Sequence, residues 1–218
     1  MKIKAILFDV IGTTVKEKDP NTVNNCLISS FHENDMHVDL ETLKAYRGFD
    51  KMDMITTIVR NRQLPGERAA AMLHSFKRNL LNSINNFTAN DGATELFSFL
   101  HQRKILIGLG TGLSRDLFEK MFEHLNWKRS DFDYIGISGE QLKGRPDPAM
   151  IIDMMEKLKI EDPKHVLKVG DTIADIREGK NAGVNTAVIL SGTQSETALK
   201  KEDPDIMVRH LIELRDLI

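Results

Sequence analysis

The order of apolar and polar positions divides the chain into three parts. The apolar run Ala5–Phe8 is typical of a strand that is buried on both faces of a parallel sheet. Between residues 17 and 88 the apolar positions recur at helical spacing instead. From residue 91 onward, short apolar runs alternate with amphipathic stretches. The pattern therefore predicts a strand, then a helical insert, then a series of alternating helices and strands.

Within the insert we predict four helices. The first carries Val23, Leu27 and Phe31, the second runs from Leu40 to Arg47 and stops at Gly48, the third follows Asp50 as its cap, and the fourth follows Pro65-Gly66 and carries Met72, Phe76, Leu80 and Ile84. Aspartate accepts hydrogen bonds from the first helical amides, and glycine favours the backbone conformation that ends helices. Apolar stripes of this width are typical of packing faces. We therefore interpret the insert as a four-helix bundle.

The remaining chain predicts a parallel sheet. We expect strands at Ile105–Leu109, Phe132–Ile137, Val166–Val169, Thr186–Leu190 and near Asp205–Val208, and helices at Gly92–Arg103, Ser114–Leu125, Pro148–Leu158, after Asp171 as far as Ala182, and at His210–Leu217. Strands that alternate with helices form parallel, doubly wound sheets. The predicted fold class is α/β, with a core domain of residues 1–16 and 89–218 and a helical cap domain of residues 17–88.

Composition and charge narrow the class of protein. The 218 residues are 41% hydrophobic and 28% charged, which is ordinary for a globular chain, and the formal net charge of −2 gives no reason to expect nucleic acid or an anionic membrane as partner. No apolar run approaches the roughly 20 residues that cross a bilayer, and the first residues predict a strand rather than a secretory leader. The single cysteine, Cys26, excludes an intrachain disulfide and should be a buried or half-buried thiol. We expect a cytoplasmic protein, either a monomer or a homodimer.

Polar residues directly follow several predicted strands. Asp9 follows the first strand, Thr111 the second and Asp171 the fourth, while Arg145 lies in the loop after the third. Asp175 comes one helical turn after Asp171 and should face the same place. The carboxyl ends of parallel strands meet at one edge of the sheet, where ligands of α/β proteins bind. Carboxylates, a hydroxyl and a cation suit a divalent ion with a phosphoryl group, and oxygen ligands without nearby His or Cys favour Mg²⁺.

Four motifs in this order carry a family resemblance. They are Asp9-Val-Ile-Gly-Thr-Thr14, Thr111-Gly112, Arg145-Pro146 and Gly170-Asp-Thr-Ile-Ala-Asp175. Their order and spacing resemble those of the haloacid dehalogenase superfamily, and the predicted helical insert lies where that superfamily has its cap. The resemblance implies a Rossmann-like core and a Mg²⁺-dependent hydrolase that forms an aspartyl phosphate on Asp9.

The resemblance also implies a role for each matching residue. Asp9 is the nucleophile; Thr111, Gly112 and Thr13 bind the phosphoryl group; Arg145 neutralises charge; and Mg²⁺ is held by Asp9, Asp171, the backbone carbonyl of Ile11, and Asp175 directly or through water. Like-charge repulsion opposes the attack of a carboxylate on an anionic phosphoryl group, so a metal and a cation must lie between them.

Ile11 departs from the common pattern of the superfamily. Its phosphatases usually carry an aspartate there, which protonates the leaving group, and loss of such a group typically costs about 10²–10⁴-fold in rate. The phosphonatase-like subgroup, the phosphonoacetaldehyde hydrolases, has alanine there, then Gly-Thr-Thr-Val as in Gly12–Val15, and arginine at the Arg145 position. Its fourth motif and the following helix resemble residues 168–183 nearly residue for residue. The sequence therefore resembles this subgroup.

That subgroup forms a Schiff base between the substrate aldehyde and a cap lysine three residues after a glycine, a spacing repeated by Gly48 and Lys51. A helix capped by Asp50 would begin there, and its N-terminus should lower the pKa of the lysine toward the neutral amine that this chemistry requires. A solvated lysine on a cap helix is the alternative interpretation. Met54 stands where the subgroup has histidine. Arg47 stands where it has methionine, and either binds an anionic part of a different substrate or lies on the surface.

Two functional hypotheses follow. The first is a Mg²⁺-dependent hydrolase of a small phosphorylated or phosphonate metabolite, in which C–P cleavage through Lys51 competes with slow ester hydrolysis of the phosphoglycolate-phosphatase type. The second is a degenerate member that binds phosphate or a phosphorylated metabolite with little turnover. Ile11 and Met54 favour the second hypothesis, whereas the retained acidic residues and Arg145 favour the first.

Overall fold

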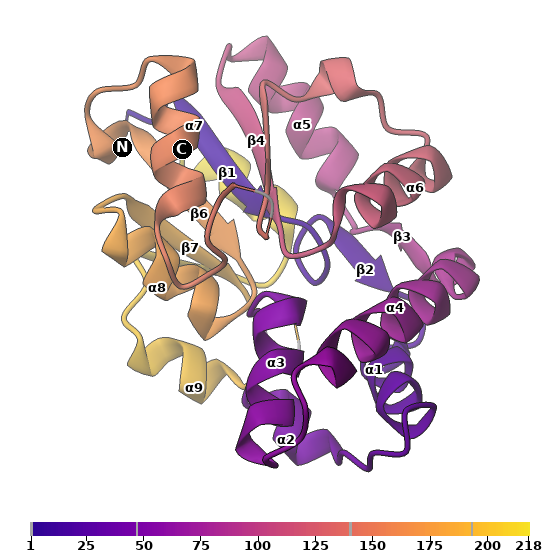
Figure 1. The fold of residues 1–218 in the computed structure, drawn as a ribbon. Helices are drawn as coiled ribbons and strands as arrows, with labels where there is room; N and C mark the ends of the chain where they lie inside the picture. The colour runs from indigo at the N-terminus through magenta and orange to yellow at the C-terminus, as the bar shows by residue number, and fades with distance from the viewer. Residues whose placement is uncertain (1, 47, 140, 193) are drawn as a thin grey trace.

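The computed structural model describes residues 2–46, 48–139, 141–192 and 194–218. Within them, a six-stranded sheet has the order β5-β4-β1-β6-β7-β8 and is flanked by helices (Figure 1). Its neighbouring strands are all parallel. The strands are β1 (Ala5–Asp9), β4 (Leu106–Thr111), β5 (Tyr134–Ile137), β6 (Val166–Gly170), β7 (Asn185–Ile189) and β8 (Ile206–Val208). The predicted α/β fold with a parallel sheet is confirmed.

The central strand β1 is buried on both faces because its side chains alternate between two apolar clusters. Ile6 and Phe8 belong to the cluster that contains Phe97, whose ring centroid lies 5.7 Å from that of Phe8. Ala5 and Leu7 belong to the other cluster, on the opposite face. The helices of this part are α5 (Ala93–Gln102), α6 (Arg115–Leu125), α7 (Ala149–Leu158), α8 (Ile173–Asn181) and α9 (Glu196–Lys201). The strand that ends in Asp9 is thus fixed at the centre of the sheet.

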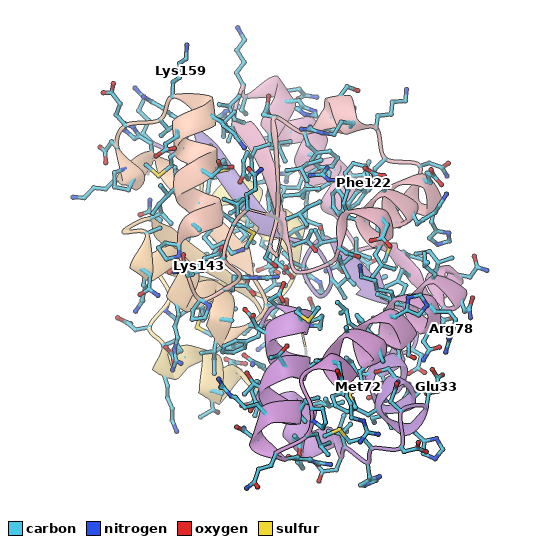
Figure 2. All side chains as sticks on the ribbon, in the orientation of Figure 1. Glu33, Met72, Arg78, Phe122, Lys143 and Lys159 are labelled. Carbon is cyan, nitrogen blue, oxygen red and sulfur yellow. The ribbon has the colours of Figure 1, made fainter. Side chains whose placement is uncertain are left out.

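Four helices form a separate group at one end of the sheet (Figure 1). They are α1 (Thr22–His32), α2 (Leu40–Lys44), α3 (Lys51–Asn61) and α4 (Glu67–Asn82), and α4 packs against both α1 and α3. Met72 of α4 lies inside this group, whereas Glu33 and Arg78 form a 2.5 Å ion pair on its outside (Figure 2). The four predicted helices are present, although Ile84, which was expected in the fourth, lies in a separate 3₁₀ helix, Ile84–Asn86. Cys26 of α1 is buried as expected. The division into core and cap domains stays a prediction.

The chain enters and leaves this helix group through two short antiparallel strands, β2 (Val15–Glu17) and β3 (Phe87–Ala89). Val15 lies opposite Ala89, and Glu17 opposite Phe87. This pair was not predicted, because three residues carry too little alternation to distinguish a strand from a loop. The predicted boundaries at 16/17 and 88/89 fall inside it.

The end of the second helix of the insert was predicted wrongly. The helix ends at Lys44 with Ala45 as its cap, rather than at Arg47, which lies outside the described residues. Gly48 is therefore not a helix-ending glycine, although its φ is +81°. A Cβ on Gly48 would lie 2.4 Å from the Thr172 hydroxyl oxygen, so the glycine allows the insert to approach the loop after β6.

The C-terminal region also differs in detail from the prediction. The expected helix His210–Leu217 is a 3₁₀ helix over Leu211–Asp216, and α9 was not predicted. Ser114 precedes α6 as expected, but its hydroxyl donates to the Asp116 carboxylate instead of capping the helix. None of the helices in the described part of the chain is both long and apolar enough to span a membrane.

Candidate active site

The ends of the central strands surround a cavity of about 90 Å³ between the sheet and the helical insert. Asp9 ends β1 and Thr111 ends β4, while Asp171 directly follows β6. The core side of the cavity is lined by these three residues together with Ile11, Gly12, Gly112, Leu113, Arg145 and Thr172. The strand ends therefore bring together the polar residues that the sequence places after them.

Arg145 joins two of the carboxylates. Its Nη1 lies 2.5 Å from Asp9 Oδ1 and 2.7 Å from Asp175 Oδ1, and the three side chains are at most 6% exposed. Asp175 thus faces the site rather than solvent. A guanidinium in contact with Asp9 offsets the negative charge of that carboxylate.

Asp171 is enclosed by small residues from two distant segments. The Thr13 hydroxyl donates to Asp171 Oδ1 over 3.2 Å. A Cβ on Gly12 or on Gly192 would lie 2.5 Å from Asp171 Oδ2, and Gly12 also has a φ of +101°. Only glycine leaves room for the carboxylate at these two positions.

A buried lysine and a buried glutamate extend the charge cluster beyond Asp175. Lys168 Nζ, on β6, is 3.0 Å from Asp175 Oδ1 and 2.9 Å from Glu178 Oε2, and both Lys168 and Glu178 are at most 1% exposed. Sequence reasoning gave these two residues no role. Lys168 could have been noticed in the sequence, because it is a charged residue inside the apolar run Val166–Val169 and a buried lysine is expected to have an acidic partner.

Burial and mutual repulsion determine the protonation of this cluster. Burial raises the pKa of Asp9, and it raises the pKa of Asp171 well above the usual range, with a further increase from the neighbouring carboxylates. Burial acts on Asp175 in the same direction, but the charges of Arg145 and Lys168 hold its pKa well below the usual value. Burial thus outweighs the charge of Arg145 at Asp9, whereas for Asp171 the neighbouring carboxylates act in the same direction as burial.

The buried charges leave room for a dication. Within the described residues, the buried carboxylates of Asp9, Asp171, Asp175 and Glu178 are accompanied by two buried cations, Arg145 and Lys168, so this cluster carries a net charge of −2 when all six groups are ionised. One oxygen from each of Asp9, Asp171 and Asp175 lies within 4.8 Å of the others. A cluster of oxygen ligands with this charge can hold a divalent metal ion.

Of the predicted phosphate-binding residues that the structure describes, two line the cavity and one does not. Thr111 and Gly112 line the cavity, and Thr111 Oγ1 accepts a hydrogen bond from the Leu113 amide over 3.1 Å. Thr13 is fully buried, its hydroxyl is directed to Asp171, and it is not among the residues that line the cavity. The structure thus gives Thr13 a carboxylate partner, and its phosphate role stays a prediction. Arg47 lies outside the described residues.

Lys51 lies on the insert side of the same cavity. It is the first residue of α3, and its Nζ donates to the Phe49 carbonyl over 3.1 Å. Met54, one turn further along α3, is buried and also lines the cavity. The cavity thus brings together Lys51 and Asp9, which are far apart in the sequence.

Asp50 connects the start of α3 to the sheet. Its Oδ1 accepts from the amides of Met52 and Asp53 over 2.8 and 3.1 Å, as the predicted cap, and its Oδ2 accepts from Ser138 Oγ over 2.7 Å. Ser138 follows β5. A Cβ on Gly144 would lie 2.7 Å from the Asp50 Cβ, so this contact is close-packed. One carboxylate thus caps the helix that carries Lys51 and attaches that helix to the core.

We expect Asp50→Ala to destabilise the protein by about 1–3 kcal/mol, because it removes a cap and leaves the buried Ser138 hydroxyl unpaired. Thermal unfolding should show a fall in Tm of about 2–12 °C for a chain of this size. Ser138→Ala, which removes only the bridge, should give a smaller fall and faster hydrogen exchange at the Met52 and Asp53 amides. Asp39→Ala removes an exposed cap without a bridge and serves as the control. Equal effects of the Asp39 and Asp50 substitutions would contradict the bridging role.

A parallel sheet whose central strands end in buried carboxylates, covered there by a helical insert, defines an α/β enzyme with an acidic site at the strand ends. The chain belongs to the haloacid dehalogenase-like hydrolases, whose family profile matches residues 6–189. The predicted membership of this superfamily is confirmed.

Relatives and solved structures agree with this assignment. The phosphonoacetaldehyde hydrolase of Bacillus cereus (strain B4264) is 29% identical over 231 residues, an alignment that spans 100% of this chain and 86% of that protein. A phosphonoacetaldehyde hydrolase-like protein from Oleispira antarctica has a TM-score of 0.85 at 16% identity, over 100% of this chain and 91% of that one. A hydrolase from Pseudomonas syringae has a TM-score of 0.87, also at 16% identity, over 98% and 96%. The resemblance to phosphonoacetaldehyde hydrolases thus extends over the whole chain, and the structural matches support the fold.

Proposed function

We propose that this hydrolase cleaves small phosphonates with an aldehyde group, using Asp9 as nucleophile and Lys51 as the amine of a Schiff base. The observation that carries the proposal is that Asp9, Arg145 and Lys51 line one cavity, with the first two on the core and the third on the insert. The relatives named phosphonoacetaldehyde hydrolase support this substrate class. Residues 17–88 would act as a cap that closes over the site and excludes water.

The proposed chemistry begins at Lys51. Its neutral amine adds to the substrate aldehyde and water leaves, which gives an imine that is then protonated. A carboxylate oxygen of Asp9 attacks phosphorus, the C–P bond breaks, and its electron pair moves into the protonated imine to give an enamine. Protonation of the enamine carbon and addition of water release the aldehyde product and regenerate Lys51. A second water hydrolyses the aspartyl phosphate to phosphate and free Asp9. No group at position 11 has to protonate an oxygen leaving group, which agrees with Ile11.

The charged residues of the site would lower the barrier to attack by Asp9. Arg145 contacts Asp9 and is positioned to offset the charge that develops on the phosphoryl oxygens. Thr111 and Gly112 would hold one of these oxygens. The net charge of −2 on the buried cluster of carboxylates, Arg145 and Lys168 fits Mg²⁺. Asp9 and Asp171 would hold this ion with the Ile11 carbonyl, and with Asp175 directly or through water. The ion would supply positive charge between the nucleophile and the phosphoryl group.

Ester hydrolysis is the second candidate function, and Met54 favours it. Met54 lines the cavity at the position of the histidine of the phosphonoacetaldehyde hydrolases, and a thioether cannot transfer protons. An ester phosphatase with Ile11 would be slow for lack of an acid. A binding protein with little turnover is the third alternative. Release of phosphate from phosphonoaldehydes and from phosphate esters, each with and without Mg²⁺, separates the three candidates.

The metal site can be tested by removal of one ligand. We expect Asp171→Ala to weaken Mg²⁺ binding by at least about tenfold, because it removes a buried carboxylate ligand. Calorimetric titration measures the affinity of each protein for Mg²⁺ directly. Asp91→Ala, at a carboxylate that is 79% exposed, is the control. The site is disproved if wild type and Asp171→Ala bind Mg²⁺ equally.

A further inference from the structure

The insert side of the cavity is mostly apolar. Leu27 of α1, Met54 of α3 and Phe76 of α4 contribute to it. Two charged residues of this side, Glu17 and Lys51, have partners: Glu17 Oε2 accepts from the Val23 amide over 2.8 Å, and Lys51 Nζ donates to the Phe49 carbonyl. A polar group without a partner on such a surface therefore needs an explanation.

Asn24 is such a group. It lies in the first turn of α1, is 5% exposed and lines the cavity. Within the part of the chain that the structure describes, its side-chain amide makes no hydrogen bond. An asparagine amide offers two N–H donors and one carbonyl acceptor, and nearly all such groups in protein interiors are paired. The partner of Asn24 is therefore expected in the cavity.

We propose that Asn24 determines substrate specificity by forming a hydrogen bond with the organic end of the substrate. This inference rests on the proposed function, in which the phosphorus end lies against Asp9 and Arg145. The substrate class is then a small phosphonate or phosphate with a carbonyl or hydroxyl group beyond the phosphorus, other than the aldehyde oxygen that leaves as water when Lys51 forms the imine, rather than a plain alkyl chain. The cavity of about 90 Å³ agrees with a small compound, because pockets for drug-sized ligands are about 300–1,000 Å³.

The physical basis of selection is the cost of leaving Asn24 unpaired. A ligand with an oxygen at its end can replace the water that hydrates the amide in the free protein. An alkyl ligand of the same size displaces this water and offers no hydrogen bond in return. A site that is built to bind a polar group therefore rejects the analogue that lacks it.

The test uses two ligands of nearly equal size, 2-hydroxyethyl phosphate and n-propyl phosphate, with inorganic phosphate as the reference. Their affinities are measured by calorimetry in the presence of Mg²⁺. Wild type should bind the hydroxyethyl compound about tenfold more tightly than the propyl compound. Asn24→Leu, which keeps the size of the side chain, should lose or reverse this preference, and Asn24→Ala should lose it. Inorganic phosphate should bind equally to all variants, because it does not reach Asn24.

Thermal unfolding provides a second measurement that does not depend on activity. Asn24→Leu should raise the Tm of the free protein, because it replaces an amide that has no partner within the protein by an apolar group beside apolar neighbours. Asn25→Leu, at the exposed next position of α1, is the matched control and should change neither the preference nor the Tm.

The outcomes separate this inference from the proposed function. An unchanged ligand preference in Asn24→Leu, or a lower Tm that shows a structural role for the amide, overturns the role of Asn24 while phosphate binding keeps the proposed site intact. Failure of wild type to bind inorganic phosphate with Mg²⁺ overturns the proposed function, and the inference about Asn24 with it.

Discussion

Lys51→Arg abolishes C–P bond cleavage and leaves Mg²⁺ binding unchanged, if the proposed Schiff base is correct. The reason is chemical: the carbon that leaves phosphorus has no oxygen to accept the electron pair, so the imine on Lys51 must accept it. Arginine keeps the positive charge but stays protonated and forms no imine. We expect phosphate release from a phosphonoaldehyde to fall below detection, by at least about 10⁴-fold, because the covalent path is removed entirely.

Chemical trapping gives an independent measurement. Borohydride should reduce the imine in wild type, and mass spectrometry should place the adduct on Lys51. Lys120→Arg, at an exposed lysine of α6, is the control for the substitution itself. Retained C–P cleavage in Lys51→Arg, or no adduct with any aldehyde tested, would identify Lys51 as a solvated residue of the insert and leave ester hydrolysis or simple binding as the function.

The second large effect concerns stability. Glu178→Leu removes one partner of the fully buried pair with Lys168 and leaves Lys168 with Asp175 only. Loss of one partner of a buried ion pair typically costs about 3–5 kcal/mol. For a chain of this size, Tm should fall by about 6–20 °C. Differential scanning calorimetry of the purified variant measures this shift.

A neighbouring residue of α8 provides the control for that experiment. Arg177, adjacent to Glu178, pairs with Glu202 at the surface, and its side chain is 53% exposed. Because surface ion pairs contribute little to the free energy of unfolding, about 0–1 kcal/mol, Arg177→Leu should shift Tm by no more than about 4 °C. Similar shifts in Tm for the two substitutions would show that the buried Lys168–Glu178 pair stabilises the protein no more than the exposed Arg177–Glu202 pair.

The sequence predicted the core of the site because parallel strands bring their carboxyl ends together. Asp9, Thr111 and Asp171 each follow an apolar run, so their shared location could be inferred from hydrophobic pattern and topology alone. The helical spacing of the insert was similarly clear. Short elements were missed, such as β2, β3 and α9, because a segment of three to six residues contains too few positions to show a period.

The missed contacts have a different physical cause. Asp50 binds Ser138, which is 88 residues away, and only tertiary packing reveals such a pair. Asn24 looks like an ordinary polar residue near the start of a helix, and its significance depends on burial beside a cavity. Gly48 was assigned to a helix end because glycine is common there. In the structure it has a positive φ and lies close to Thr172, and the sequence alone does not distinguish these reasons for a glycine.

The pairing of β2 with β3 has a consequence for how such enzymes can change over evolution. Val15 and Ala89 lie opposite each other, so the two points where the insert joins the sheet are about 5 Å apart. A tight turn of two residues can close such a gap. Recombination can therefore exchange the whole helical segment without stretching the sheet. Asp9, Arg145 and Asp171 would stay in place during such an exchange, whereas Asn24 and Lys51 would be replaced together. Attack on phosphorus would then be inherited with the sheet, whereas C–P cleavage and the choice of compound would be inherited together with the insert.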